Sequence, residues 1–479
     1  MTHHTGTSQE PARRPRGFGV RQSSAALFST GHNQERQRTA ALHDAVACQF
    51  APPRSMAAEQ VRKEQTASPQ PRKRILVLNA GGEWYGSDKV LFYALSFLSR
   101  WHDCLVVLPF AGILDRRLAE AGIACRVQHY AVMRRVFFTP WKAPRWAVDF
   151  AFSTARLLPL VRRFDPDLIY SNSVSVLEGA VLSRWLGRRH LWHLHDILDR
   201  PAWLSAVLRW LPRHLAEDTL CVSQAVARHI GPGRSVKTVH NGIPAVVAAP
   251  RFRPVAADSP FTVGVLGRFS AHKGQLDLLR ALDYLRRHRG VGDRLRVRLV
   301  GGVFADDERW RDQAKAFVAA RGLGRVVRIE DFTETIETIY PELDLLVLPT
   351  IQADSFPTVA LEAMSCGIPV VAYRNGGVEE MLDGDPDCLV DLRDHRALGR
   401  TIQRFSEDDR LRLDKARHQY RTYLARFTLE HFEQRFFEAT GLGPYPGQRA
   451  EAVGSARGLL RDAGNSGQAR SFPATPGCS

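Results

Sequence analysis

The sequence predicts an α/β fold of two doubly wound, Rossmann-like domains that face a cleft. Short apolar runs of strand length recur along the chain, and most are followed by a turn rich in Gly, Ser or Asn and then by a helical segment. This alternation is typical of parallel sheets covered by helices. A stretch rich in Ala, Pro and Arg, residues 244–260, predicts a linker. We therefore expect a disordered basic leader (1–72), an N-terminal domain (73–252), a C-terminal domain (253–440) and a disordered tail (441–479).

The composition is that of a globular protein with an unusual surplus of positive charge. Of the 479 residues, 44% are hydrophobic and 24% are charged, and the formal net charge is +16. Such a surplus suggests acidic partners, namely nucleic acid, an anionic membrane or a phosphorylated substrate. The basic residues are spread over the ends and the helix surfaces, and no nucleic-acid-binding motif appears. We therefore expect no nucleic-acid partner.

The cysteines and the apolar runs bear on the compartment. The seven Cys residues are scattered, with no pair at metal-ligand spacing, which fits reduced thiols in a cytosol. No run reaches about 18 apolar residues, so we expect no transmembrane helix. No apolar core follows the Arg residues at the start, so no signal peptide is expected. The sequence predicts a cytoplasmic protein with no metal site and no cofactor.

A Gly-rich turn follows the first expected strand, residues 73–79. The turn and the helix after it contain Gly82, Gly86, Ser87 and Asp88. A strand, a Gly-rich turn and a helix can form a dinucleotide-binding fingerprint, but the G-x-G-x-x-G spacing is absent here. A tight turn that needs Gly, followed by a helix N-cap, is the alternative.

The segment 132–163 differs from its neighbours, the expected strands at 104–108 and 123–127. In it Arg and Lys alternate with Phe and Trp. This pattern suits a segment in a lipid interface, because basic side chains attract anionic headgroups and aromatic rings lie at headgroup depth. An ordinary helix, with its apolar side on the sheet and its Arg side in water, is an equally supported interpretation.

Two histidines lie on the expected strand 191–196, which reads LWHLHD. Alternation places His193 and His195 on the same face. A strand His is usually a satisfied core residue. Here, however, Asp196 follows at the carboxyl end of a parallel strand, where α/β sheets place ligands. No G-x-S-x-G motif accompanies these residues, so the sequence does not favour a hydrolase.

The second domain opens with a strand at 261–266 that leads to Gly267 and Arg268. A short turn then brings Lys273 to the start of the next expected helix. Two fixed cations a few residues apart suit a diphosphate, because they neutralise the charge that grows as a sugar leaves. A single Arg or Lys in a loop is, by contrast, mostly solvated.

The most informative stretch is a strand at 343–348, a loop, a helix and a second strand. Asp354 in the loop and Glu362 in the helix can both face a ligand at the helix N-terminus, which favours phosphate. A carboxylate at either position could also accept hydrogen bonds from sugar hydroxyls. The alternative is a loop cap and a helix-face residue paired with Lys or Arg. The residues that signal the helix start are Ser355, Phe356, Pro357 and Thr358.

Residues 348–378, LPTIQADSFPTVALEAMSCGIPVVAYRNGGV, resemble the signature of the retaining, nucleotide-sugar-dependent glycosyltransferases of family four. That pattern is Glu, seven residues, Glu, then Ala-Met and Gly-x-Pro-Val. Glu362 holds the second position here, and Asp354 replaces the first Glu. Gly-Arg-x-x-x-x-Lys-Gly at 267–274 and the Gly-rich loop at 81–91 are similar to two further motifs of the family.

The resemblance implies the GT-B fold, with the last helices crossing back to brace the N-terminal domain. It also implies transfer of a sugar from a nucleotide diphosphate sugar to a hydroxyl acceptor, with retention of anomeric configuration. The implied roles are the diphosphate for Arg268 and Lys273, the ribose for Glu362, the donor sugar for Asp354, and the acceptor side for His195 and Asp196. Further substrate contacts are implied for Gly82, Gly86, Ser87, Asp88, Gly267, Ser355, Phe356, Pro357 and Thr358.

The segment 132–163 suggests a lipid-linked or polysaccharide acceptor of the cell envelope, reached from the inner face of the plasma membrane. One alternative is a degenerate, non-catalytic protein that binds a nucleotide sugar or a membrane surface. A nucleotide-sugar epimerase shares the expected fold but would need more acid/base groups around the sugar.

Overall fold

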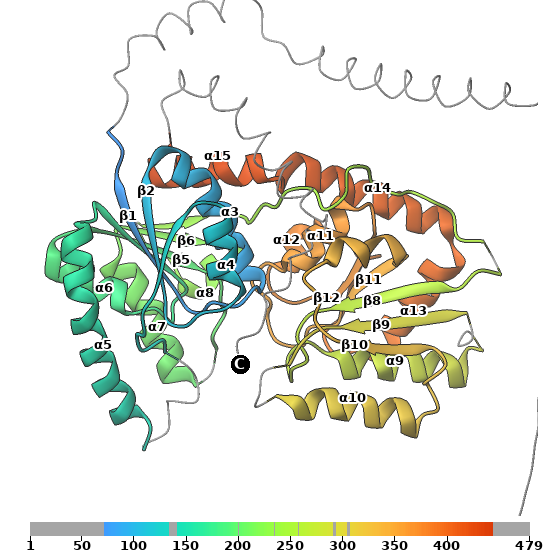
Figure 1. The fold of residues 1–479 in the computed structure, drawn as a ribbon. Coiled ribbons are helices and arrows are strands. Elements are labelled where there is room, and N and C mark those ends of the chain that lie inside the picture. The colour runs from blue at the N-terminus through green and yellow to red at the C-terminus, as the bar shows by residue number, and fades with distance from the viewer. Residues whose placement is uncertain are drawn as a thin grey trace, which may run out of the picture. The chain divides into compact units, whose positions relative to one another are not determined.

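The computed structural model describes residues 71–133, 141–199, 201–233, 235–256, 258–290, 294–303 and 307–443. The expected leader and tail lie outside these residues, apart from 71–72 and 441–443. The described chain contains two parallel sheets with helices around them (Figure 1). The predicted fold class, two doubly wound α/β domains, is confirmed.

The first sheet has seven parallel strands in the order β3-β2-β1-β4-β5-β6-β7. Its strands are β1 (Arg74–Asn79), β2 (Asp103–Leu108), β3 (Ala124–Val127), β4 (Leu168–Asn172), β5 (Arg189–Leu194), β6 (Asp218–Cys221) and β7 (Val236–Thr238). The helices between them are α3 (Gly86–Trp101), α4 (Ile113–Glu120), α5 (Ala143–Phe164), α6 (Glu178–Leu186), α7 (Ala202–Leu215) and α8 (Gln224–Ile230).

The second sheet has six strands in the order β10-β9-β8-β11-β12-β13. Its strands are β8 (Phe261–Leu266), β9 (Leu295–Val300), β10 (Val327–Glu330), β11 (Leu345–Leu348), β12 (Val370–Tyr373) and β13 (Leu389–Val390). The remaining helices are α9 (Gln275–His288), α10 (Glu308–Ala320), α11 (Thr358–Ser365), α12 (Val378–Met381), α13 (His395–Glu407), α14 (Asp409–Arg426) and α15 (Leu429–Thr440), with short 3-10 turns at Ile336–Thr338 and Tyr340–Glu342.

In each sheet, successive strands are first added on one side of the first strand and then on the other, so the strand order reverses at one point. In the first sheet this point lies between β1 and β4, and in the second between β8 and β11. Loops that leave the carboxyl ends of such neighbouring strands turn to opposite faces, so a space forms between them where α/β proteins bind ligands. The residues that follow β1, β4, β8 and β11 are therefore the first place to look for a site.

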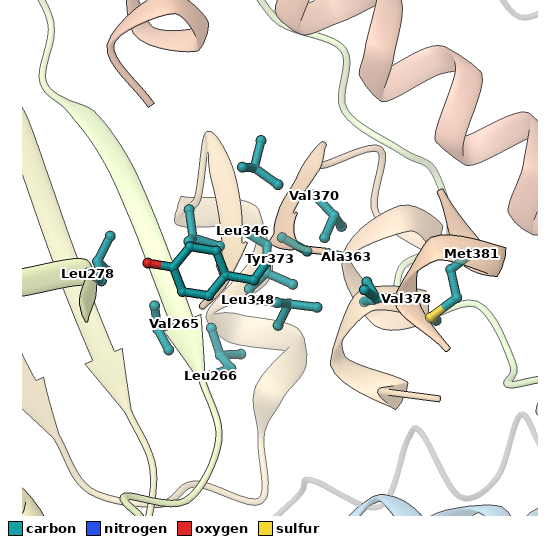
Figure 2. Packing of buried hydrophobic residues seen from close by; sticks show 14 of the residues in the cluster. Val265, Leu266, Leu278, Leu346, Leu348, Ala363, Val370, Tyr373, Val378 and Met381 are labelled. Atoms are coloured by element: carbon teal, nitrogen blue, oxygen red, sulfur yellow. The ribbon is translucent and has the colours of Figure 1, made fainter. Parts of the chain in front are cut away.

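The central strands are buried on both faces, which explains their continuous apolar sequences. In the second sheet, Leu346, Val370 and Tyr373 pack with Val265 and with residues of the covering helices (Figure 2). Tyr373 is only 1% exposed, and its ring extends towards Leu278 of α9, near Val265 (Figure 2). Alternation is absent because there is no polar side for these strands to face.

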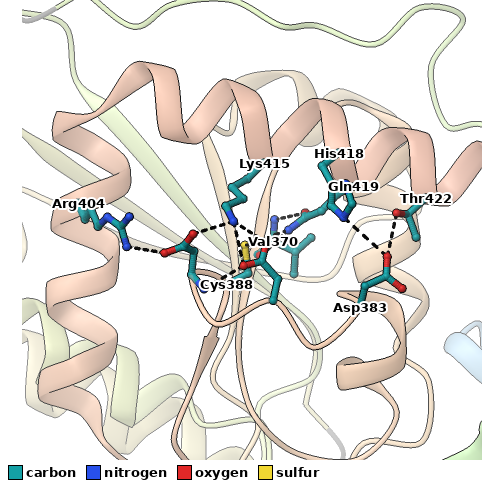
Figure 3. Close-up of polar contacts among 10 residues, drawn as sticks. Val370, Asp383, Cys388, Arg404, Lys415, His418, Gln419 and Thr422 are labelled. Atoms are coloured by element: carbon teal, nitrogen blue, oxygen red, sulfur yellow. Dashed lines mark hydrogen bonds and ion pairs between the residues drawn. The ribbon is translucent and has the colours of Figure 1, made fainter.

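Helix α14 is fastened to the second sheet by polar contacts at its edge (Figure 3). The Lys415 ammonium forms ion pairs of 2.7 Å with both Asp385 and Asp387. The Gln419 amide accepts from the Val370 N–H at 2.7 Å and donates to the Val370 carbonyl at 3.1 Å. These contacts fix the helix that precedes α15.

The chain then crosses to the first sheet. Phe427 O accepts a hydrogen bond of 3.1 Å from the Ile243 N–H, and the Tyr423 hydroxyl donates to the Ile243 carbonyl at 3.0 Å. Beyond them, α15 packs on α3, where the ring of Phe97 lies 5.2 to 5.5 Å from three Phe rings of α15 (Figure 1). The exact domain limits given above stay predictions.

Two further features concern the described residues only. None of their helices is both long and apolar enough to cross a bilayer. The described residues contain no cluster of three or more His, Cys, Asp or Glu side chains arranged to hold a metal ion.

Candidate functional site

The turn after β1 is shaped by close backbone approach. A Cβ at Gly82 would lie 2.5 Å from the Phe110 carbonyl oxygen, so only Gly fits there. Asp88 lies three positions into α3, and its Oδ2 accepts the Tyr85 N–H at 3.0 Å. Its Oδ1 accepts a hydrogen bond of 2.9 Å from the Asn79 amide.

Asp88 therefore caps its own helix. It is 6% exposed, and burial raises the pKa of its carboxyl to about 6, against the lowering effect of its two hydrogen bonds. Both carboxylate oxygens are engaged within the turn. The helix-cap interpretation describes Asp88, and a substrate contact for it stays a prediction, as it does for the half-buried Ser87.

The start of α3 lies against the start of α11. A Cβ at Gly86 would lie 3.2 Å from the Thr358 hydroxyl oxygen, so a side chain there would press on the neighbouring helix. Helix N-termini expose unpaired N–H groups and carry partial positive charge. The N-termini of α3, beside the first sheet, and of α11, beside the second, lie close together here. Together they favour an anionic ligand.

The loop after β8 places a cation beside this point. Gly267 has φ +141°, a conformation that favours Gly, and it leads directly to Arg268. The Arg268 guanidinium lies 5.2 Å from the centroid of the Tyr85 ring, within cation–π range. Burial lowers the pKa of Arg268 from its ordinary value, and Tyr85, Asp307 and Glu83 counter that effect. Gln275 holds the Arg268 carbonyl through a hydrogen bond of 3.0 Å.

Lys273 and Asp354 form an ion pair, with 2.6 Å between Nζ and Oδ2. Both are partly exposed, at 33% and 18% of their side chains. The loop that carries Asp354 is held by the Gly turn after β12, because the Gly377 N–H donates to the Asp354 carbonyl at 2.8 Å. A Cβ on Gly376 would lie 2.1 Å from that same carbonyl oxygen.

The helix start predicted at Ser355 to Thr358 is confirmed. Pro357 is the N-cap and Thr358 is the first residue of α11. The Phe356 side chain is 3% exposed and stacks on His240 at 5.1 Å between ring centroids, with Phe427 5.4 Å away. The Phe356 ring thus packs between the segment after β7 and the junction of α14 with α15. A substrate contact by Phe356 or by the half-buried Ser355 stays a prediction.

Glu362 has two partners and is almost completely buried. Its Oε1 lies 2.8 Å from Lys89 Nζ, and its Oε2 accepts from the Tyr340 hydroxyl at 2.6 Å. The side chain is 3% exposed. The pairing with Lys is the structural alternative that the sequence left open, and contact with a ribose stays a prediction. Lys89, on the first turns of α3, was missed because its partner lies 273 positions away.

His193 in β5 and His195 just after it share one face, as predicted, with 4.2 Å between their ring centroids. His195 is 8% exposed, and its Nε2 lies 2.8 Å from Asn172 Oδ1. Burial lowers the pKa of His195 to about 3, so the ring is neutral at pH 7. The exposed Asp196 accepts a hydrogen bond of 3.1 Å from Ser173.

Sequence reasoning also missed the two residues that connect Asp88 with His195. Asn79 and Asn172 end β1 and β4 and are 1% and 0% exposed. Their signal was an Asn at the carboxyl end of two adjacent apolar strands, which is unusual because buried amides must be hydrogen-bonded.

The sheets and the residues at their carboxyl edges define a protein of the GT-B class, with two Rossmann-like halves. A family model described as Glycosyltransferase Family 4 matches residues 86–246, and one described as Glycosyl transferases group 1 matches residues 248–424. The chain belongs to the group 1 glycosyltransferases.

Two curated relatives and one solved structure illustrate the similarity. D-inositol 3-phosphate glycosyltransferase 1 of Catenulispora acidiphila is 29% identical over 214 residues, which is 43% of this chain and 51% of the relative. The putative colanic acid biosynthesis glycosyltransferase WcaL of Escherichia coli is 26% identical over 33% of this chain and 39% of its own length. The chain thus spans about half the length, or less, of these relatives.

The structural match extends further. HepE of Anabaena, solved with UDP and glucose, superposes with a TM-score of 0.66 at 22% sequence identity. The match covers 77% of this chain and 100% of that one. At this identity the similarity establishes the GT-B fold.

Proposed function

We propose that the chain transfers a sugar from a nucleoside diphosphate sugar to a hydroxyl acceptor, with retention of anomeric configuration. The observation that carries the proposal is the start of α3, which touches two segments of the second domain, the loop after β8 and helix α11. Tyr85 lies against Arg268, Gly86 lies against Thr358, and Lys89 pairs with Glu362. The residues expected to hold a nucleotide sugar are thereby connected through one short segment.

The chemistry follows from the charges. As the bond between the anomeric carbon and the diphosphate breaks, negative charge grows on the leaving oxygen. Arg268, Lys273 and the N-terminus of α11 would stabilise that charge. Removing one preorganised donor of this kind typically costs about 3–4 kcal/mol of activation free energy. The acceptor oxygen forms the new bond, and its proton passes to the diphosphate, because the buried His195 is a poor base.

In this reaction Asp354 and Glu362 bind hydroxyl groups rather than protons. Asp354 is partly exposed and paired with Lys273, so a donor sugar would approach that pair and share it. Glu362 would accept from the ribose through the edge of its carboxylate that faces Lys89. Neither carboxylate has the isolated, apolar surroundings of a general acid.

Binding of nucleoside diphosphates tests the donor half of the proposal. A ligand at a hundredfold its dissociation constant stabilises a protein by about 2.7 kcal/mol, which a thermal shift detects. UDP is the first ligand to use, since HepE was solved with it. We expect a shift with one nucleotide that Lys273→Ala and Glu362→Ala abolish. No shift with any nucleoside diphosphate would reject the proposal, and binding without transfer would indicate a binding-only protein.

We also propose that the acceptor is lipid-linked or part of a cell-envelope polysaccharide, and that the chain works at the inner face of the plasma membrane. The outer face of α5 supports this. Val148 and Phe152 are 56% and 65% exposed, and Trp141 just before the helix is 91% exposed. Arg145 and Arg156 are exposed beside them. Residues 134–140 of the expected interfacial segment lie outside the described residues.

A second helix presents the same chemistry. On α7, Trp203, Val207 and Trp210 are 59%, 45% and 48% exposed at helical spacing. Apolar and basic side chains together favour an anionic bilayer surface. Flotation with vesicles of anionic and of neutral lipid tests this: we expect anionic vesicles alone to bind, and Phe152→Ser with Trp210→Ser to release the protein. Equal flotation of the variant would remove the support.

A further inference from the structure

A buried chain of side-chain hydrogen bonds crosses the carboxyl edge of the first sheet. It begins at Asp88 in α3, passes through Asn79 at the end of β1 and Asn172 at the end of β4, and ends at His195 after β5. The three distances are 2.9, 2.8 and 2.8 Å. Each of the four residues is at most 8% exposed.

The Asp88 end fixes the direction of the chain. The Asn79 amide NH₂ donates to Asp88 Oδ1 at 2.9 Å and to the Gly81 carbonyl at 2.8 Å. Both of its hydrogens are therefore used, and its Oδ1 must accept from Asn172 Nδ2. A carboxylate at this position has no donor, so reversing the Asn79 amide would set two acceptors against each other.

The same logic reaches His195. With its nitrogen turned to Asn79, Asn172 presents Oδ1 to His195 Nε2 at 2.8 Å. The Tyr170 hydroxyl lies 3.4 Å from this oxygen and 2.8 Å from His193 Nδ1. An amide oxygen only accepts, so Nε2 must carry the proton. In a neutral imidazole, Nδ1 is then a lone-pair acceptor.

We infer that Asp88, Asn79 and Asn172 are positioning residues that hold His195 in the Nε2–H tautomer and thereby make its Nδ1 a hydrogen-bond acceptor for a substrate hydroxyl. The tautomer follows from the buried chain alone, whereas the substrate contact rests on the proposed function. A hydroxyl that donates to Nδ1 keeps its oxygen lone pairs available, which suits a sugar substrate. A protonated ring would offer only N–H donors, so the hydroxyl would have to accept from Nδ1–H and would give up a lone pair.

The tautomer can be measured without activity. Nitrogen-15 labelling of the histidines in the full chain and two-dimensional NMR of the ring nitrogens distinguish the two tautomers and the imidazolium. The His195 signal is identified by its loss in His195→Gln. We expect a protonated Nε2 and an unprotonated Nδ1 at neutral pH. An unprotonated Nε2, or an imidazolium, would overturn the inference whatever the protein catalyses.

Asn172→Leu tests the chain itself, and Ser171→Ala is its control. Leu has nearly the shape of Asn but no oxygen that accepts from Nε2–H, so the neutral His195 ring should no longer be held in the Nε2–H tautomer and its Nδ1–H form should appear. Ser171 lies on the same strand, is equally buried and loses a hydrogen bond to His190 instead, so its variant should keep the wild-type His195 signal. An unchanged His195 signal in Asn172→Leu would reject the positioning role of the chain.

Kinetics separate the substrate contact from the tautomer. Loss of one hydrogen bond to a hydroxyl corresponds to about a tenfold change in KM. We expect Asn172→Leu to raise the KM for the hydroxyl substrate about tenfold at an unchanged dissociation constant for the nucleoside diphosphate. The expected tautomer with an unchanged KM would reject only the substrate contact. No transfer by the wild type would reject the proposed function and leave the tautomer result standing.

Discussion

Lys89 of α3 and Glu362 of α11 form an ion pair of 2.8 Å between the two sheets, with side chains only 12% and 3% exposed. Both charged groups lose hydration when they are buried, and the ion pair compensates for that loss. Removing either partner therefore leaves a buried charge without compensation and lowers stability. Tyr340 adds a hydrogen bond of 2.6 Å to the same carboxylate. The pair therefore joins the first turns of two helices whose N-termini form the candidate phosphate site.

Replacing one partner of this ion pair should destabilise the protein more than replacing both. We expect Lys89→Met to cost about 3–5 kcal/mol, because Glu362 is left buried without a cation. Lys89→Met combined with Glu362→Gln should recover part of that loss. Urea unfolding of the two single variants and the double variant measures the coupling. Additive effects would mean that the pair does not act as a unit.

Lys273 should matter for turnover more than for stability. Its ammonium is one-third exposed and the carboxylate of its partner Asp354 is 18% exposed, so water still reaches the charge that remains after its removal. If it stabilises the leaving diphosphate, Lys273→Met should lower kcat about a hundredfold to a thousandfold. Lys315→Met on the exposed side of α10 is the matched control and should keep wild-type kcat. A kcat for Lys273→Met within a factor of two of the control would exclude the assigned role.

Phe356 should contribute through packing. Its ring lies between His240 and Phe427, and Phe to Ala changes in such positions cost about 3–5 kcal/mol. We expect Phe356→Ala to lower the free energy of unfolding by that amount, as measured in urea. Leu392, which is 45% exposed, offers a control whose Ala variant should change stability little. Equal effects of the two variants would contradict the packing role.

Glu178 should make stability depend on pH. It is completely buried, and burial raises the pKa of its carboxyl to about 8 from its ordinary value of 4.5. As pH rises, Glu178 loses its proton at a lower pH in the unfolded chain than in the folded protein. The protonated carboxyl therefore contributes fully to folding stability below the unfolded pKa. This contribution is lost as pH rises to the folded pKa. Each pKa unit corresponds to about 1.4 kcal/mol.

The test compares wild type with Glu178→Gln, which keeps the shape without the titration. We expect the variant to gain stability relative to wild type between about pH 5 and about pH 8 in urea unfolding. A difference that stays constant over this range would show that the carboxyl does not keep its proton in the folded protein.

Local patterns were sufficient for much of the fold and for the family. Apolar runs marked the strands, and Pro357 with Thr358 marked the start of α11, because strand burial and helix capping are decided by a few neighbouring residues. The spacing of Asp354 and Glu362, and of Arg268 and Lys273, carried the family resemblance that the family models confirm.

The sequence by itself thus determined the two parallel sheets and the side chains placed at their carboxyl ends. Only the tertiary structure decided how those side chains are used. It paired Glu362 with Lys89, turned Asp88 into a helix cap and buried Phe356 against His240. It also ordered the amides that fix His195. The physical reason is that hydrogen bonds and ion pairs depend on distances in space, and these partners come from strands and helices that are far apart in the chain.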